Sequence, residues 1–309
     1  MRKIMIVTAN RAERGLLQPV RVELSKLGLA TEWVNLPEGR VTETTFALLD
    51  SAFKEAPDIV LVPCDREEMV YPAAYAFHSG HILAHFHAGN LGSDHPDEMN
   101  RRAISCFSHI LLCNTEEDKK NLIRMGEEES RCHVVGSTAF DDVKYDYSLC
   151  PNYPYALVLL HPDPDPEKTR KDLQEAVAAV QDYVGLVWLA PNHDPNHEII
   201  RNFLADPQIK GKAFPKAWQV NIELQNLQRE TFLGLLQKCA LFVGNSSSLV
   251  YELPYINPQA KTISIGNRNK CREKPAEIVI GGSKRIAELL ATIPIDDKLR
   301  RKHFCLPPT

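Results

Sequence analysis

Near its start the chain reads Ile4-Met5-Ile6-Val7-Thr8-Ala9-Asn10-Arg11, a short apolar run that ends in polar residues. Over residues 16–27, apolar side chains return at every third or fourth position. The run predicts a buried strand, and the spacing predicts an amphipathic helix. The pattern continues with expected strands at 58–62, 82–86, 109–113 and 133–135 and an expected helix at 44–56. Alternating strands and helices predict a parallel sheet that is covered on both faces.

The alternation is interrupted at residues 146–154, a proline-bearing segment without periodicity that we interpret as a linker. It resumes with expected strands at 155–160, 185–190, 218–222, 241–243 and 262–265, and expected helices at 166–183, 196–204 and 228–239. We therefore predict an α/β protein of two Rossmann-like domains, residues 1–150 and 151–309, that face a cleft. A ligand is expected in that cleft, at the carboxyl ends of the strands.

The composition is that of a soluble globular protein, with 44% hydrophobic and 25% charged residues among 309. Because the net charge is −4, neither nucleic acid nor an anionic membrane surface is an expected partner. The first apolar run is too short for a secretory signal, and no stretch reaches the roughly 18 to 20 apolar residues that span a bilayer. We therefore expect a cytoplasmic protein. The eight cysteines contain no CxxC pair, which favours reduced thiols.

Arg11 lies where the first expected strand passes into a helix. Free backbone N–H groups and the helix dipole favour an anion at such a point. Arg11 is therefore a candidate for binding a phosphate or carboxylate, and a solvated arginine is the alternative. No GxGxxG fingerprint for a dinucleotide occurs in this loop.

Asp65, Arg66 and Glu68 follow the next buried strand. Asp65 could act as a base or hold a sugar hydroxyl, with Arg66 orienting it and Glu68 close by. The alternative for this loop is a set of solvated charges without a ligand.

Histidines gather around the third expected strand, with acidic residues downstream of it. His85 and His87 would point to the same face of a strand, so a metal site is one hypothesis. The acids Asp97 and Glu98 lie beyond a glycine-containing loop, so a third convergent ligand is not evident. We favour proton transfer by imidazoles near neutral pH, with His87 as a catalytic candidate and no metal.

Polar residues also end the strands of the second half. His161 follows one strand, and Asn192 and Asp194 follow the next, so we expect all three to face the ligand. The strand at 241–243 runs into Ser246 and Ser247, which open a helix that continues to Glu252. Serine hydroxyls and exposed amides bind phosphate through neutral donors, and a serine N-cap without a ligand is the alternative.

Two arginines follow the last expected strand. Arg268 and Arg272 lie with Lys270 on one loop and could complement the charge of a diphosphate.

The order of these motifs resembles the UDP-N-acetylglucosamine 2-epimerases, closest to the hydrolysing branch, which releases UDP and N-acetylmannosamine. The resemblance spans nearly the whole chain. Its motifs are Arg11 to Leu17, Asp65 to Glu68, His85 to Gly89, Asp97 to Ile104, Ser108-His109, Asn114 to Glu117, Val135-Gly136, His161-Pro162, Pro191 to Pro195, Gly244 to Ser248 and Ile265 to Arg268.

The resemblance implies a glycosyltransferase-B-like pair of domains, with UDP held by the C-terminal half and the sugar facing the N-terminal half. In such enzymes, removal of the C2 proton and loss of UDP give a 2-acetamidoglycal, to which water adds. No cofactor is implied, a homo-oligomer is expected, and the product feeds the synthesis of sialic acid or surface polysaccharide. The nucleotide contacts carried over are Arg11, Asn192, Ser246, Ser247, Glu252 and Arg272, and the acid/base carboxylates are Asp65 and Asp97.

Three positions depart from the pattern of that family. The hydrolysing branch has a glutamate where this chain has Asn90, a histidine where it has Arg102 and a glycine where it has Cys64. A carboxamide cannot shuttle a proton. The alternatives are therefore a sugar-nucleotide-binding or glycosyl-transferring relative without epimerase turnover and, from another class, a metal hydrolase built on the histidines.

Overall fold

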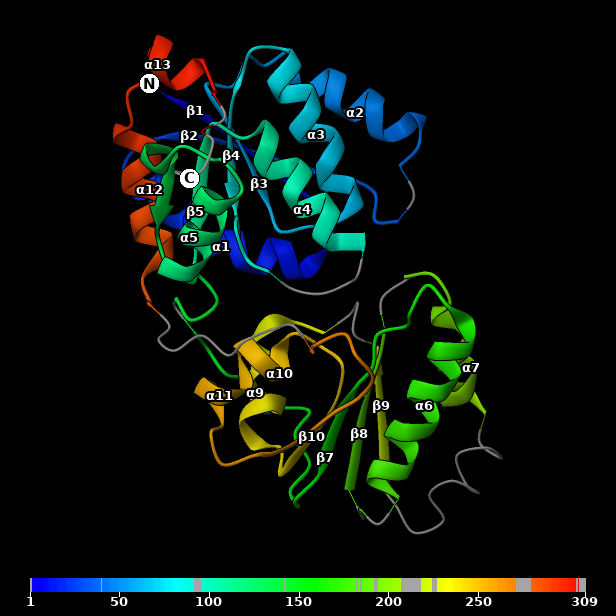
Figure 1. Ribbon diagram of the computed structural model, residues 1–309. Coiled ribbons are helices and arrows are strands. Elements are labelled where there is room, and N and C mark those ends of the chain that lie inside the picture. The colour runs from blue at the N-terminus through cyan, green and yellow to red at the C-terminus, as the bar shows by residue number, and fades with distance from the viewer. Residues whose placement is uncertain are drawn as a thin grey trace. The chain divides into compact units, whose positions relative to one another are not determined.

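The computed structural model divides the chain into two compact units, Met1–Asp142 with Pro275–Thr309 and Val143–Lys274, which we call the first and second units (Figure 1). Residues 2–39, 41–91, 96–141, 143–181, 183, 185–191, 194–206, 218–223, 227–270, 279–303 and 305 are described. No helix within these ranges is both long enough and apolar enough to cross a membrane.

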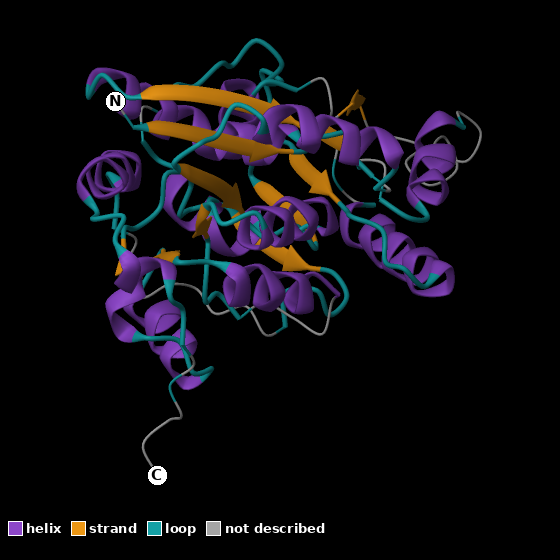
Figure 2. Ribbon diagram, turned by 90° about the horizontal axis from the view of Figure 1, so that it is seen from above, coloured by secondary structure: helices purple, strands orange, loops and turns teal. Residues whose placement is uncertain are grey.

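The first unit contains a six-stranded parallel sheet in the order β2-β1-β3-β4-β5-β6. Its strands are β1 (Lys3–Thr8), β2 (Ala30–Asn35), β3 (Ile59–Pro63), β4 (Ile82–Phe86), β5 (Ile110–Cys113) and β6 (Cys132–Val134). The strand order reverses between β1 and β3, which is where Rossmann-like sheets bind ligands. Figure 2 shows strands side by side with helices around them.

Helices cover both faces of this sheet. They are α1 (Arg11–Lys26), α2 (Glu43–Phe53), α3 (Glu67–His78), α4 (Pro96–Phe107), α5 (Glu116–Arg124), α12 (Gly282–Thr292) and α13 (Asp297–Arg300), with a 3-10 turn at Glu129–Arg131. Ile4 and Ile6 of β1 pack towards Leu17 of α1. Met5 of β1 packs towards Met69 of α3 on the other face. The continuous apolar run in β1 is therefore buried from both sides, as the sequence predicts.

The structure divides the chain differently from the expected boundary, because the C-terminal residues join the first unit. Ile286, Ala287 and Leu290 of α12 are fully buried in the same core as Leu17. Arg2 donates a 2.8 Å hydrogen bond to the carbonyl of Ile293. Residues 151–309 are thus not one domain, because the apolar face of α12 is buried against α1.

The second unit contains a five-stranded parallel sheet in the order β11-β10-β7-β8-β9. The strands are β7 (Ala156–Leu159), β8 (Gly185–Ala190), β9 (Trp218–Glu223), β10 (Leu241–Gly244) and β11 (Lys261–Ser264). The helices are α6 (Pro166–Val180), α7 (His197–Ala205), α9 (Arg229–Lys238), α10 (Ser248–Tyr251) and α11 (Leu253–Ile256). The predicted α/β class with Rossmann-like parallel sheets is confirmed.

The expected linker is part of the second unit. The Asp146 backbone N–H donates to the carbonyl of Glu230 at 2.9 Å, and Thr231 Oγ1 donates to the Asp146 carboxylate at 2.7 Å. These bonds fix the start of the segment against α9.

Candidate functional site

The turn between β1 and α1 contains a buried carboxyl group, Glu13, and a half-buried arginine, Arg11, two residues before it. Asn10 and Glu13 form a capping box, in which Asn10 Oδ1 accepts from the Glu13 N–H at 2.9 Å. Glu13 Oε2 accepts from the Ala9 N–H at 2.7 Å, and burial raises the Glu13 pKa to about 7. Arg11 is the first residue of the helix, and among the described residues nothing accepts a hydrogen bond from its buried Nη1. A buried cationic donor of this kind suits an anionic ligand.

The loop after β3 begins with a residue in an unusual conformation. Cys64 has a φ of 59°, in the left-handed region that glycine adopts without strain. The family's glycine at this place therefore has a conformational reason, and here a cysteine adopts the same backbone. The Cys64 carbonyl is 2.7 Å from His85 Nε2, and its sulfur is 3.6 Å from His87 Nδ1.

Asp65 is held by an arginine of α4. Arg101 Nη2 donates to Asp65 Oδ2, and both side chains are largely buried. Arg101 Nη1 donates to both the backbone and the side-chain oxygen of Asn90, each at 2.9 Å. Asp97 lies one helical turn before Arg101, so both belong to the same face of α4. The structure thus joins Asp65 to Asn90 through Arg101 and places Asp97 on the same helix face.

The two histidines have different surroundings. His85 is fully buried on β4, with Nδ1 2.9 Å from Ser105 Oγ and Nε2 bonded to the Cys64 carbonyl. Because a carbonyl only accepts, Nε2 carries the proton of the neutral ring and Ser105 donates to Nδ1. Burial lowers the pKa of His85 to about 3. His85 is therefore a neutral side chain that connects α4 to the loop at Cys64 through two hydrogen bonds.

His87 lies one residue past the end of β4, with a φ of 66°. The expectation that His85 and His87 share a strand face is wrong, because the chain leaves the strand before His87. Burial lowers the pKa of His87 to about 4, and its buried Nε2 has no hydrogen-bond partner among the described residues. In the described ranges no three His, Cys, Asp or Glu side chains form a group that could hold a metal ion.

The other predicted charges of the first unit pair with one another. Glu68 accepts from Arg66 Nε and Nη2, each at 3.2 Å, and from the Gly39 N–H at 2.7 Å. Arg102, where the family has a histidine, donates from Nε to Glu98 at 3.1 Å. Arg66 and Glu68 thus form an ion pair close to Asp65 in the chain, in which the Glu68 side chain is buried.

In the second unit, β7 and β10 end in loops tied by an asparagine. Asn245 Oδ1 accepts from the His161 N–H at 2.7 Å, and Asn245 Nδ2 donates to the His161 carbonyl at 2.8 Å. His161 Nδ1 lies 3.9 Å from the Asp194 carboxylate. The structure therefore brings His161 and Asp194 together beside the serine loop.

The serine loop leads into α10, which has only four residues. Ser246 is buried, and its hydroxyl oxygen accepts from the Ser248 N–H at 3.3 Å. Glu252 lies between α10 and α11 and accepts from Arg229 Nη2 at 3.1 Å. Arg268 is half-buried in the loop after β11. The predicted residues Asn192 and Arg272 lie outside the described residues.

Three polar residues of the first unit were not predicted as site residues from the sequence: Glu13, which lies two residues after Arg11, Arg101, which bonds Asp65, and Asp118, which bonds Asn90. Their sequence signals are local. Glu13 and Asp118 are each the third residue of a helix and complete its capping box, and Arg101 is four residues after Asp97. Such spacing predicts where a helix begins and which residues share a helix face. It does not predict which distant loop a side chain will contact.

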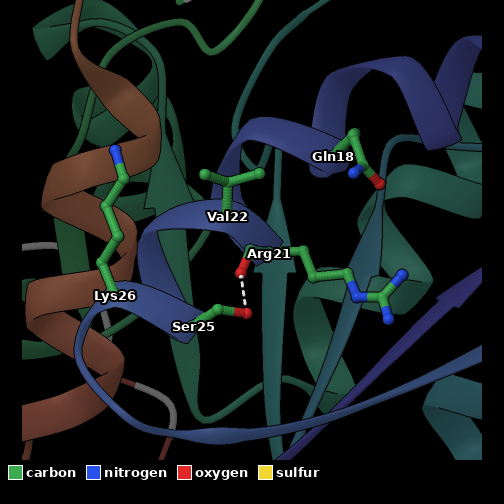
Figure 3. Close-up of a pocket in the computed structure, with 5 residues that line it drawn as sticks. All are labelled: Gln18, Arg21, Val22, Ser25 and Lys26. Carbon is green, nitrogen blue, oxygen red and sulfur yellow. Dashed lines mark hydrogen bonds between the residues drawn. The ribbon is translucent and has the colours of Figure 1, made fainter.

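A cavity of about 480 Å³ lies on α1, away from these groups (Figure 3). Gln18, Arg21, Val22, Ser25 and Lys26 line it, and Ser25 Oγ donates to the Arg21 carbonyl at 2.9 Å. None of the predicted site residues contributes to its lining.

Comparison with known proteins extends over most of the chain. Residues 5–303 match a family model described as UDP-N-acetylglucosamine 2-epimerase. A Legionella pneumophila protein named UDP-N,N'-diacetylbacillosamine 2-epimerase (hydrolyzing) is 28% identical over 242 residues, 73% of this chain and 60% of that protein. A Neisseria meningitidis UDP-N-acetylglucosamine 2-epimerase is 29% identical over 263 residues, 79% of this chain and 65% of that protein. The chain thus spans less than two thirds of the length of these two relatives.

The fold is shared with a solved structure from S. aureus, MnaA with UDP. The match has a TM-score of 0.70 at 19% identity and covers 97% of this chain and 90% of that one. At this identity the likeness concerns the fold.

Proposed function

Because the chain belongs to the UDP-N-acetylglucosamine 2-epimerase family, we propose that it hydrolyses UDP-N-acetylglucosamine, or a closely related UDP-N-acetylhexosamine, to UDP and the 2-epimeric free sugar. For UDP-N-acetylglucosamine the product is N-acetylmannosamine, a precursor for surface-sugar synthesis. The hydrolysing course is supported by the name of the Legionella relative. We also keep the prediction of a cytoplasmic homo-oligomer.

The proposed chemistry is an elimination followed by an addition. A base removes the C2 proton, the C2–H electrons form a C1–C2 double bond, and the C1–O bond breaks with UDP as the leaving group. Water then adds its hydroxyl group at C1. A proton adds at C2 on the face opposite to the one from which the first proton was removed, so the configuration at C2 is inverted. These steps need acid and base groups near the sugar and no cofactor.

The observation that carries this proposal is the Asp65–Arg101 ion pair at the carboxyl end of β3. A neighbouring guanidinium favours the ionised form of a carboxyl group, and that form can accept a proton. Asp97 lies on the same face of α4 as Arg101 and is the second carboxyl group of the proposed acid/base pair. His87, with a buried Nε2 that no described residue bonds, is proposed as a third group at the sugar.

Nucleotide binding is proposed mainly for the second unit. Ser246 and Ser247 can donate hydroxyl hydrogens to a diphosphate, and Glu252, held by Arg229, can accept from ribose hydroxyls. Further proposed substrate contacts are Arg11, Arg66, Glu68, His161, Asn192, Asp194, Arg268 and Arg272. Cations and neutral donors together suit a diphosphate on a protein whose net charge is −4.

The alternative is a sugar-nucleotide-binding or glycosyl-transferring protein without epimerase turnover. Asn90 favours it, because an amide replaces the family's glutamate beside Arg101.

The test is incubation of the purified protein with UDP-N-acetylglucosamine, followed by NMR for UDP and N-acetylmannosamine. Both products should accumulate in equal amounts. A protein that is inert towards a panel of UDP-, GDP- and CMP-sugars, yet is stabilised against heat by UDP, would support the binding protein instead. A ligand at about 100 times its dissociation constant stabilises by roughly 2.7 kcal/mol, which thermal shift detects.

A further inference from the structure

Asn90 lies between a cation and a carboxyl group, and its amide contacts both. Its Oδ1 accepts from Arg101 Nη1 at 2.9 Å. Its side chain also forms a hydrogen bond with Asp118. Arg101 can only donate and an ionised carboxylate can only accept, so the amide oxygen faces Arg101 and the amide nitrogen faces Asp118. An amide is the group that satisfies both neighbours at once.

The packing around this amide leaves little room for adjustment. A Cβ built on Gly89 would lie 2.1 Å from the Asp118 carbonyl oxygen, and Gly89 has a φ of 81°. Asn121 Nδ2 donates to the Gly89 carbonyl at 3.1 Å. Asp118 is buried, and its Oδ2 accepts from the Thr115 N–H at 3.0 Å in the capping box of α5. The turn at Gly89 and the start of α5 therefore hold Asn90 and Asp118 in fixed register.

Asp118 makes a carboxylate at position 90 unfavourable. An acidic side chain there would keep the bond to Arg101 but would face the Asp118 carboxylate in a buried site. Burial already raises the pKa of Asp118. Two carboxylates at hydrogen-bond distance cannot both ionise without a large cost, so one of them would retain a proton at neutral pH.

We propose that Asn90 is a positioning residue. Its backbone and side-chain oxygens accept from Arg101 Nη1 and so orient the guanidinium, whose Nη2 donates to Asp65. The amide of Asn90 and the carboxylate of Asp118 form a matched pair. The amide stands where the related family has an acidic residue. The functional part of this inference rests on the proposed role of Asp65 in the 2-epimerase reaction. The structural part concerns the free energy of unfolding and does not depend on turnover.

A swap of the two side chains tests the matched pair. Asn90→Asp should lower the melting temperature by roughly 3 °C or more at pH 8. The loss should shrink at pH 5, because the raised pKa of the crowded carboxyl pair lets it bind a proton in the folded state. In the double variant Asn90→Asp/Asp118→Asn the amide again donates to the carboxylate, so most of the loss should be recovered. A double variant no more stable than the sum of the single changes would overturn the matched pair.

A second cycle tests the positioning of Arg101 on Asp65 without any substrate. Asn90→Ala and Asp65→Asn should destabilise by less together than the sum of their separate effects, because both act on one guanidinium. Strictly additive effects on the melting temperature would show that Asn90 does not position Arg101.

Turnover gives the functional readout. With UDP-N-acetylglucosamine, Asn90→Ala should lower kcat at least about tenfold while KM changes less than about threefold. Lys120→Ala, on the exposed side of α5, is the control, because it changes the same helix without touching Arg101 or the Gly89 turn, and its kcat should stay within about threefold. Equal kcat losses in both variants would overturn the functional part. An inactive wild type would contradict the proposed function, and the two stability cycles would still decide the inference about Asn90.

Discussion

Cys64 and His87 share a left-handed backbone conformation that non-glycine residues rarely adopt. Their side chains contact each other, and Cys64 directly precedes Asp65 of the Asp65–Arg101–Asn90 cluster in the chain. Strained backbone of this kind persists where the surrounding structure holds it, and it concentrates at functional sites. The hydrogen bond from His85 to the Cys64 carbonyl is one such restraint. The backbone conformation at Cys64 therefore contributes to the position of Asp65, the next residue.

Asp65→Asn is predicted to separate chemistry from binding. The amide keeps the shape of the side chain but cannot take a proton, so turnover should fall about 100-fold or more while the UDP dissociation constant is unchanged. Steady-state kinetics and calorimetry check this. Asp58→Asn, at the opposite end of the same strand, is the control and should leave both quantities unchanged. If binding of the UDP-sugar falls as much as the rate, Asp65 holds the sugar and does not transfer the proton.

Ser246 and Ser247 are predicted to bind the diphosphate. Replacing both by alanine removes two donors, each contributing about 0.5 to 1.5 kcal/mol and more with a charged acceptor. The UDP dissociation constant should rise at least about tenfold, with little change in melting temperature. The exposed Ser25, changed to alanine, should have no effect on UDP binding. An unchanged dissociation constant in the double variant would mean that the serines serve only the local fold of the loop.

At the scale of elements, α12 is an integral part of the first unit. Its buried face shares a core with α1 and β1. Arg131, before β6, donates to the carbonyls of Lys298 and Leu299 at 2.9 and 2.7 Å, and Lys302 forms a buried ion pair with Glu127 at 2.8 Å. These contacts fix α13 and the residues directly after it to the rest of the first unit.

Leu290→Ala is predicted to destabilise the protein by about 2 to 5 kcal/mol, the usual cost of a cavity at a fully buried leucine. Urea unfolding checks this through the midpoint of the transition. Glu288→Ala, on the exposed side of the same helix, should change the free energy of unfolding by less than about 0.5 kcal/mol. Equal effects of the two changes would mean that α12 does not belong to the core.

For the whole molecule, buried titratable groups predict loss of stability in acid. Burial lowers the pKa values of His85, His87 and His109 to about 3, 4 and 4, so each binds its proton more readily in the unfolded chain. Their stabilisation is present above the unfolded pKa of about 6.5 and is lost as the pH falls. Glu13, with a pKa raised to about 7, acts in the opposite sense, because its stabilisation is present below an unfolded value near 4.5 and is lost as the pH rises.

Of these four groups, the three histidines each take up a proton on unfolding between roughly pH 6 and 5 and Glu13 releases one, so together they take up about two protons. These four groups should therefore contribute a fall in the free energy of unfolding of up to about 3 kcal/mol per pH unit in that range, at about 1.36 kcal/mol per proton. Denaturant unfolding at several pH values measures the slope. Glu13→Gln should make it steeper, and an unchanged slope in that variant would contradict the raised pKa of Glu13 in the folded protein.

The sequence by itself determined the element pattern and the order of the motifs. Apolar runs such as Ile4 to Val7 can be buried on both faces only within a covered parallel sheet, and that requirement is local. β2 was not predicted, because residues such as Glu32 leave this edge strand only partly buried. The candidate loops were also predicted, since polar residues directly after buried strands lie at one edge of a parallel sheet.

Only the tertiary structure decided which side chains meet within those loops. Asp65 and Arg101 are 36 residues apart, and Asn90 contacts Asp118 across a turn that admits no side chain on Gly89. The return of α12 to the first unit depends on the apolar face of α1, 270 residues away in the chain. Such contacts follow from shape and hydrogen bonding between distant segments. Local periodicity contains no information about them, so the role of Asn90 becomes visible only when its neighbours are known.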